Sequence, residues 1–130
     1  MENFGAEGRL GPVNSPFEPG ITLVVMVRDD AERLDRCLAS AKDAADKVIV
    51  MDTGSKDGSL DVAKKHGAET FAIEWPDAFV EALNQLLDRV KTEWTLRLDS
   101  DEWLEPDAAQ SIRRVVEEPD AFLISLMRRD

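Results

Sequence analysis

The sequence has little cysteine and no concentrated positive charge, and each of these shortages excludes some classes of protein. Cys37 is the single cysteine, so the chain has no internal disulfide, which is typical of a protein in a reducing compartment. The 16 lysines and arginines are outnumbered by 27 aspartates and glutamates, giving a net charge of -11. Because no basic cluster stands out, a surface that binds nucleic acid through its phosphates is not predicted.

Long apolar runs are missing as well. No stretch approaches the ~18–20 residues that a membrane-spanning helix needs, and the N-terminus lacks the basic and apolar regions of a signal peptide. We therefore predict a cytoplasmic protein without a membrane span. Residues 1–20, rich in glycine and proline, are predicted to form a flexible arm ahead of one domain over residues 21–130.

Apolar periodicity predicts alternating strands and helices after that arm. Nearly continuous apolar runs predict buried strands at 21–27, 48–51, 70–73, 95–98 and 122–126. Apolar residues at helical spacing predict helices at 31–42, at 60–66, along 79–90 and from Pro106 onward. This alternation is typical of an α/β fold with a mostly parallel sheet.

Acidic residues follow several of these strands, at the edge where ligands of parallel sheets bind. Asp52 ends the second strand, and Asp99, Asp101 and Glu102 crowd into four residues after the fourth. Carboxylates so close repel one another, and Mg²⁺ or Mn²⁺ would neutralise them. A solvated acidic turn before the helix at Pro106 is the alternative, and the segment alone does not separate the two. Glu102 is expected to bond backbone in that turn.

Four segments together resemble a known family. They are 21–30, 52–59 (Asp-Thr-Gly-Ser-Lys-Asp-Gly-Ser), 75–84 and 93–102. Their order and spacing, across about residues 21–127, resemble the nucleotide-binding N-terminal half of a family 2 glycosyltransferase. The resemblance implies a three-layer α/β/α GT-A fold, truncated because a complete domain of this type has a second half. That half normally supplies the acceptor site and the general base, so no catalytic residue is assigned.

The resemblance also implies roles for individual residues around a nucleotide. Asp52 would hydrogen-bond the nucleoside, at the base or the ribose. Val27 and Arg28 would line the base pocket, and Asn84 would face the nucleotide from its helix. The family commonly has an arginine where this chain has Leu83, so we expect weaker donor binding.

A metal and a donor follow from the same resemblance. Asp101 would ligate Mg²⁺ or Mn²⁺ on the diphosphate, and Asp99 would reach the ribose or help hold the metal through water. The donor would be a nucleotide-diphosphate sugar, with a UDP-sugar favoured by family habit. The implied activity is an inverting glycosyltransferase, and the isolated chain need not be active without its second half.

Two other functions compete with this one. The chain could be a non-catalytic GT-A module that acts in nucleotide binding or protein assembly, as a homodimer or with a second chain that covers an apolar edge at 122–127. A nucleotidyltransferase is disfavoured, because such an enzyme normally has a glycine-rich basic loop after the first strand. His66 and Cys37 are expected to be structural, whereas Trp103, beside the acidic cluster, is kept as a donor or acceptor contact.

Overall fold

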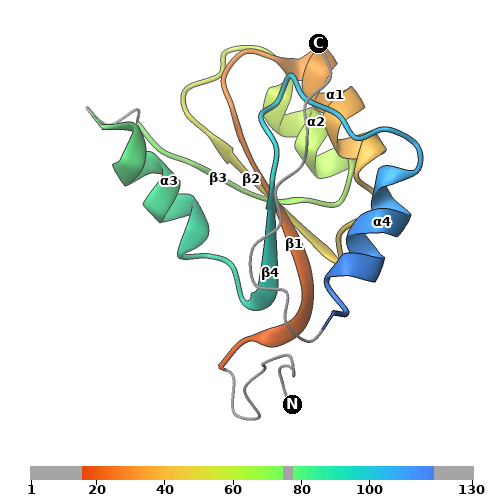
Figure 1. Ribbon diagram of the computed structural model, residues 1–130. Helices are drawn as coiled ribbons and strands as arrows, with labels where there is room; N and C mark the ends of the chain where they lie inside the picture. Colours follow the sequence, from red (N-terminus) through yellow and green to blue (C-terminus); the bar gives the residue numbers. More distant parts are fainter. Residues whose placement is uncertain (1–15, 75–77, 119–130) are drawn as a thin grey trace.

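A computed structural model of the chain describes residues 16–74 and 78–118 (Figure 1). Strands and helices alternate along these residues, as the periodicity predicts. The strands are β1 (Glu18–Val27), β2 (Lys47–Asp52), β3 (Glu69–Ala72) and β4 (Thr92–Arg97). The helices are α1 (Ala31–Ser40), α2 (Ser59–Lys65), α3 (Phe79–Leu87) and α4 (Ala108–Val115). The fifth predicted strand, at 122–126, lies outside the described residues.

The strands form one parallel sheet in the order β3-β2-β1-β4. Val27 at the end of β1 is in register with Asp52 at the end of β2, and Val24 of β1 pairs with Arg97 at the end of β4. The carboxyl ends of these strands therefore meet at one edge, which we call the rim. The prediction of an α/β fold with a parallel sheet is confirmed.

Helices cover both faces of the sheet, with α1, α2 and α4 on one side and α3 on the other (Figure 1). Alternate side chains of β1 supply the two cores, because successive residues of a strand point to opposite faces. Leu23 and Val25 pack with Leu34 of α1, whereas Val24 packs with Leu86 of α3. Each such side chain, fully buried, contributes about 1.5–3 kcal/mol.

The first strand begins at Glu18, three residues earlier than predicted. The Glu18 amide donates to the Lys91 carbonyl at 2.8 Å, and the register then shifts before Ile21. Gly20 makes that irregularity with a φ of 126°, and the Asp46 carboxylate accepts the Ile21 amide at 2.8 Å. Proline and glycine in this segment conceal the strand start from periodicity, since both are uncommon inside strands.

Helix α3 buries a narrower face than its sequence predicts. The expected apolar stripe consisted of Phe79, Leu83, Leu86, Leu87 and Val90. The structure buries Ala82, Leu86 and Val90 against the sheet, because residues four apart lie along one line of a helix. Leu83 is half-buried, and Phe79 and Leu87 are exposed over 45% and 38% of their surface, so the stripe prediction is wrong for those two residues.

Candidate functional site

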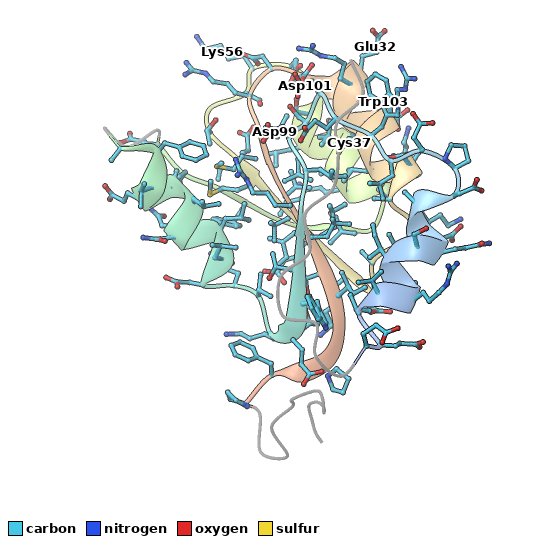
Figure 2. All side chains as sticks on the ribbon, viewed as in Figure 1. Glu32, Cys37, Lys56, Asp99, Asp101 and Trp103 are labelled. Atoms are coloured by element: carbon cyan, nitrogen blue, oxygen red, sulfur yellow. The ribbon has the colours of Figure 1, made fainter. Side chains whose placement is uncertain are left out.

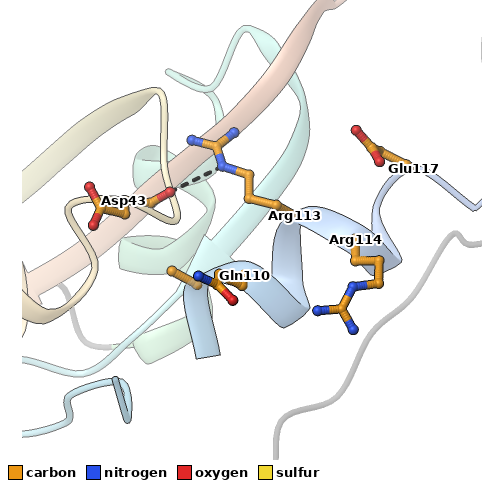
Figure 3. A pocket seen from close by; sticks show the side chains of 6 residues that line it. Asp43, Gln110, Arg113, Arg114 and Glu117 are labelled. Atoms are coloured by element: carbon orange, nitrogen blue, oxygen red, sulfur yellow. Dashed lines mark hydrogen bonds between the residues drawn. The ribbon is translucent and has the colours of Figure 1, made fainter. Parts of the chain in front are cut away.

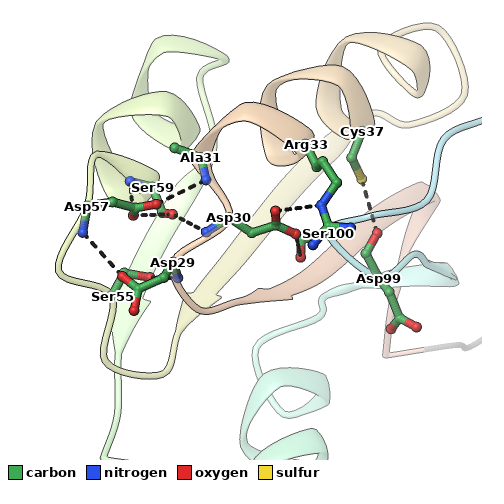
Figure 4. A network of polar contacts seen from close by, with 10 residues as sticks. All are labelled: Asp29, Asp30, Ala31, Arg33, Cys37, Ser55, Asp57, Ser59, Asp99 and Ser100. Atoms are coloured by element: carbon green, nitrogen blue, oxygen red, sulfur yellow. Dashed lines mark hydrogen bonds and ion pairs between the residues drawn. The ribbon is translucent and has the colours of Figure 1, made fainter.

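Three loops meet at the rim, each following a strand (Figure 4). They span residues 28–30 after β1, 53–58 after β2 and 98–102 after β4. The first and third are joined directly, because the Ser100 hydroxyl donates to the Asp30 carboxylate at 2.8 Å. The structure therefore gathers three of the four segments that carry the family resemblance into one place.

Asp29 holds the first two loops together. It takes the left-handed backbone conformation, with a φ of 50°, which aspartate tolerates better than most residues. Its carboxylate accepts the amides of Lys56 at 2.6 Å and Asp57 at 3.3 Å, and its own amide donates to the Ser55 hydroxyl at 2.8 Å. The Asp29 carboxylate is thus engaged by backbone N–H groups of the neighbouring loop.

Asp57 connects the starts of two helices. Its carboxylate accepts the amide and the hydroxyl of Ser59, the first residue of α2, at 2.9 and 2.6 Å. It also accepts the amide of Ala31, the first residue of α1, at 3.2 Å. These bonds, with the Ser59 hydroxyl first, hold the pKa of Asp57 below its usual value. The Asp57 carboxylate therefore stays ionised beside the first residues of α1 and α2, where the positive ends of both helix dipoles favour a negative charge.

From its place at the strand end we expect Asp52 to point off the strand, free to accept hydrogen bonds. Its carboxylate instead folds back onto its own turn. Only 4% of its surface is exposed, and its carboxylate accepts the amides of Gly54 at 3.4 Å and Ser55 at 3.1 Å. Gly54 permits this turn with a φ of 117°. A carboxylate has about four lone-pair sites, so Asp52 retains capacity for another donor. Its nucleoside contact stays a prediction.

In the acidic loop after β4, one carboxylate is bonded to the backbone and two are exposed to solvent. Glu102 accepts the Asp99 amide at 2.8 Å, as expected of a residue that bonds backbone in the turn. The side chain of Asp99 is 57% exposed and lies 3.4 Å from the Arg97 guanidinium. Asp101 is exposed and makes no hydrogen bond or ion pair with any residue in 16–74 or 78–118. Two acids of this loop thus face solvent.

These carboxylates fit a metal that a phosphate ligand helps to hold. Within the described ranges, no group of three or more histidine, cysteine, aspartate or glutamate side chains is arranged to ligate a metal. Mg²⁺ bound together with a diphosphate needs only one or two carboxylates, because phosphate oxygens and waters complete its shell. Asp99 and Asp101 supply that number of hard oxygen ligands.

The remaining predicted residues are placed unequally. Val27 is buried at the end of β1, and its carbonyl accepts the Thr53 amide at 3.0 Å. Arg28 is exposed beside it. Asn84 is exposed on α3, and no hydrogen bond links its side chain to the described rim loops. The structure therefore brings Val27, Arg28, Asp52 and the acidic loop to the rim but does not tie Asn84 to them.

Trp103 lies near the acidic loop and is 44% exposed. Figure 2 shows Trp103 at the same end of the molecule as Asp99 and Asp101. The Arg36 guanidinium of α1 lies 3.5 Å from the centroid of its ring, a cation–π contact that covers indole surface. Sequence reasoning missed this contact, because no pattern along the chain pairs a helix arginine with a loop tryptophan.

Two residues with reactive side chains make contacts within the fold. Cys37 is fully buried, its thiol lies 3.6 Å from the Asp99 carbonyl, and burial raises its pKa to about 12. Such a thiol is a poor nucleophile, because thiolate is the reactive form. His66 lies 2.7 Å from the Asp35 carboxylate at the end of α2.

An open hollow on the surface lies away from the rim (Figure 3). Its lining residues are Asp43, Ala109, Gln110, Arg113, Arg114 and Glu117. Asp43 precedes β2, so the hollow is near the amino end of that strand, opposite the edge where the acidic loops gather. It is therefore not part of the predicted site.

The parallel sheet, the helices on both faces and the acidic rim define a GT-A-like α/β domain. The sequence matches the family described as Glycosyl transferase family 2 over residues 22–130. The chain belongs to this family. No helix in the described part is both long and apolar enough to cross a membrane.

Two curated relatives match most of this chain. A TPR repeat-containing protein of Synechococcus elongatus is 39% identical over 110 residues, which are 85% of this chain and 27% of that protein. The prophage-derived glycosyltransferase SunS of Bacillus subtilis is 28% identical over 108 residues, covering 82% of this chain and 26% of SunS. The chain thus spans about a quarter of the length of these relatives.

Solved structures confirm the fold. Glucosyl-3-phosphoglycerate synthase of Mycobacterium tuberculosis, in complex with UDP, superposes with a TM-score of 0.60 at 20% identity, covering 77% of this chain and 39% of that one. The same enzyme with Mn²⁺, UDP and glucosyl-3-phosphoglycerate gives a TM-score of 0.55 at 20% identity, over 63% and 33% of the two chains. The GT-A assignment made from the sequence is confirmed.

Proposed function

We propose that this chain binds a nucleotide-diphosphate sugar at the rim, with Mg²⁺ or Mn²⁺ held by Asp101 and Asp99. The observation that carries the proposal is the pair of exposed carboxylates directly after β4 in a family 2 chain. A metal cation would offset the repulsion between this acidic chain and a diphosphate, and these two side chains supply ligands for one. The structural relative that is solved with both UDP and Mn²⁺ supports a UDP-sugar as the donor.

Other rim residues would position the nucleoside. Asp52 would accept a hydrogen bond from the base or ribose, with its carboxylate oriented by its own turn. Val27 and Arg28 would line the base pocket beside it, and Asn84 would approach from α3. The bonds between the loops after β1 and β2 support this role, because they fix the backbone around Asp52 before any ligand binds.

The reaction would be attack of an acceptor nucleophile on the anomeric carbon, with the nucleoside diphosphate departing. A bound metal supplies Lewis-acid stabilisation of the leaving diphosphate. The residues of this chain would bind and orient the donor. We assign no general base, since no carboxylate of the described rim is distinguished as one.

Calorimetric titration of UDP, with and without Mn²⁺ and with GDP as comparison, tests the proposal. The parent is expected to bind UDP more tightly with Mn²⁺, and Asp101→Asn is expected to lose that gain, because a neutral amide binds a hard cation more weakly than a carboxylate does. Glu105→Gln is the matched control, since it removes an exposed acid that lies between β4 and α4 but outside the loop at 98–102. Absence of nucleotide binding by the folded parent, or equal losses in both variants, would contradict the proposal.

A further inference from the structure

Arg97 ends β4 and lies on the α3 side of the sheet. It pairs with Val24, whose side chain belongs to the core beneath α3, whereas its neighbour Leu96 packs toward the other core. The Arg97 guanidinium lies 5.4 Å from the centroid of the Phe79 ring, at the start of α3. The Arg97 side chain therefore lies where the end of β4, the start of α3 and the rim come together.

The contacts of Arg97 hold its guanidinium beside the acidic loop without using up its donors. One nitrogen lies 3.4 Å from the Asp99 carboxylate, and 44% of the side chain is exposed. A guanidinium has five N–H donors in a planar fork, and the long contact to Asp99 uses one of them. No other hydrogen bond of this guanidinium to the described residues is found, so its remaining donors are available beside the carboxylates proposed to hold the metal.

Two other arginines near the rim, both on α1, are less suited to bind an anion, and Arg28 is the residue proposed to line the base pocket. Arg33 is bonded to the Asp30 carboxylate at 2.7 Å, and Arg36 lies over the Trp103 ring at 3.5 Å. Both are therefore already engaged. Arg97 differs because its backbone is fixed within the sheet and its contact to a carboxylate is longer, at 3.4 Å.

We infer that Arg97 binds an oxygen of the donor's diphosphate group, on the side of the acidic loop that faces α3. This inference rests on the proposed function, because it requires the diphosphate at the rim. Arginine matches the geometry of phosphate oxygens better than lysine does. In a chain with a net charge of -11, a fixed cation here would offset the repulsion between the diphosphate and the acids around it.

The test is UDP affinity in the presence of Mn²⁺ for the parent, Arg97→Gln and Arg97→Lys. A charged hydrogen bond contributes about ten- to a hundredfold in affinity, so Arg97→Gln should weaken binding by at least about tenfold and Arg97→Lys by less. UDP affinity should also depend less on salt in Arg97→Gln, since one ionic contact is lost. Thermal unfolding of each variant shows whether the fold is retained.

Arg89→Gln is the matched control. Arg89 lies 3.7 Å from the Phe71 ring centroid and 3.5 Å from the Glu69 carboxylate, so it repeats the contacts of Arg97 away from the rim. Unchanged UDP affinity in Arg97→Gln, equal weakening in Arg89→Gln, or binding by Arg97→Lys no tighter than by Arg97→Gln would overturn the inference while leaving donor binding intact. Failure of the parent itself to bind UDP would overturn the proposed function and this inference with it.

Discussion

A hydrogen bond between two buried threonines joins β1 to β4, and the neighbouring contacts identify which hydroxyl is the donor. Thr22 and Thr92 are 1% and 3% exposed, and their hydroxyl oxygens are 2.6 Å apart. The Thr92 hydroxyl donates to the Trp94 carbonyl at 2.9 Å. Since a hydroxyl has one hydrogen, Thr92 cannot also donate to Thr22, so Thr22 is the donor of the pair. The two threonines are therefore not equivalent, and their replacement by valine should have unequal costs.

Thr22→Val removes the donor and leaves Thr92 bonded to Trp94, so the loss is one net hydrogen bond, about 0.5–1.5 kcal/mol. Thr92→Val leaves the Thr22 hydroxyl buried without its acceptor and removes the donor to Trp94, which costs about 1–3 kcal/mol for the stranded group in addition to the bond. The double variant should be more stable than the sum of the single losses predicts, because it buries no stranded hydroxyl.

Equilibrium unfolding in urea at pH 7 measures these differences directly. Thr95→Val is the control, since Thr95 is an exposed residue of the same strand, and its effect should stay within about 0.5 kcal/mol. The donor assignment fails if Thr22→Val costs as much as Thr92→Val. Strict additivity in the double variant would refute the role of the buried hydroxyl.

Two further predictions concern carboxylates. Asp29→Ala should be about 1 kcal/mol less stable than Asp29→Gly in urea unfolding, because both lose the bonds to Lys56 and Asp57 but alanine alone strains the left-handed backbone; equal stabilities would contradict this. The Arg113 guanidinium, with a backbone amide, lowers the pKa of Asp46 in the folded state. The ionised Asp46 therefore stabilises the fold fully above the unfolded pKa of about 3.9, and this stabilisation is lost as pH falls through the lower folded pKa. Asp46→Asn should therefore lose less stability than the parent below about pH 4, and parallel pH profiles would count against the ion pair.

Much of the fold could be predicted from the sequence because parallel strands are buried on both faces. Val24 and Val25 face opposite cores, so β1 reads as an unbroken apolar run. The start of β1 could not be predicted, since Gly20 interrupts the pattern where the strand irregularity lies. The face of α3 was mistaken at Phe79, because apolar spacing alone does not say which side chains the sheet covers.

The site was predictable at the level of segments and less so at the level of bonds. The sequence pattern shows where the apolar strands end, so Asp52 and Asp99 could be placed at the carboxyl edge of the sheet from the sequence alone. The partner of each carboxylate depends on where backbone N–H groups point, and that is set by loop geometry. For this reason the bonds from Asp52 to its own turn and from Asp29 to the neighbouring loop were not foreseen.

The acidic side chains of the rim differ in how readily they can bind a metal, because some of them already accept hydrogen bonds from the backbone. Asp29 and Asp57 bind backbone amides, and Glu102 binds the Asp99 amide, so their charges are already stabilised by the fold. A metal must compete with those bonds to use them. Asp101 has no such bond within the described residues, and Asp99 has only the long contact to an arginine. A cation that binds at this rim therefore gains most from these two side chains, which is why Asp101→Asn separates a working donor site from a merely acidic surface.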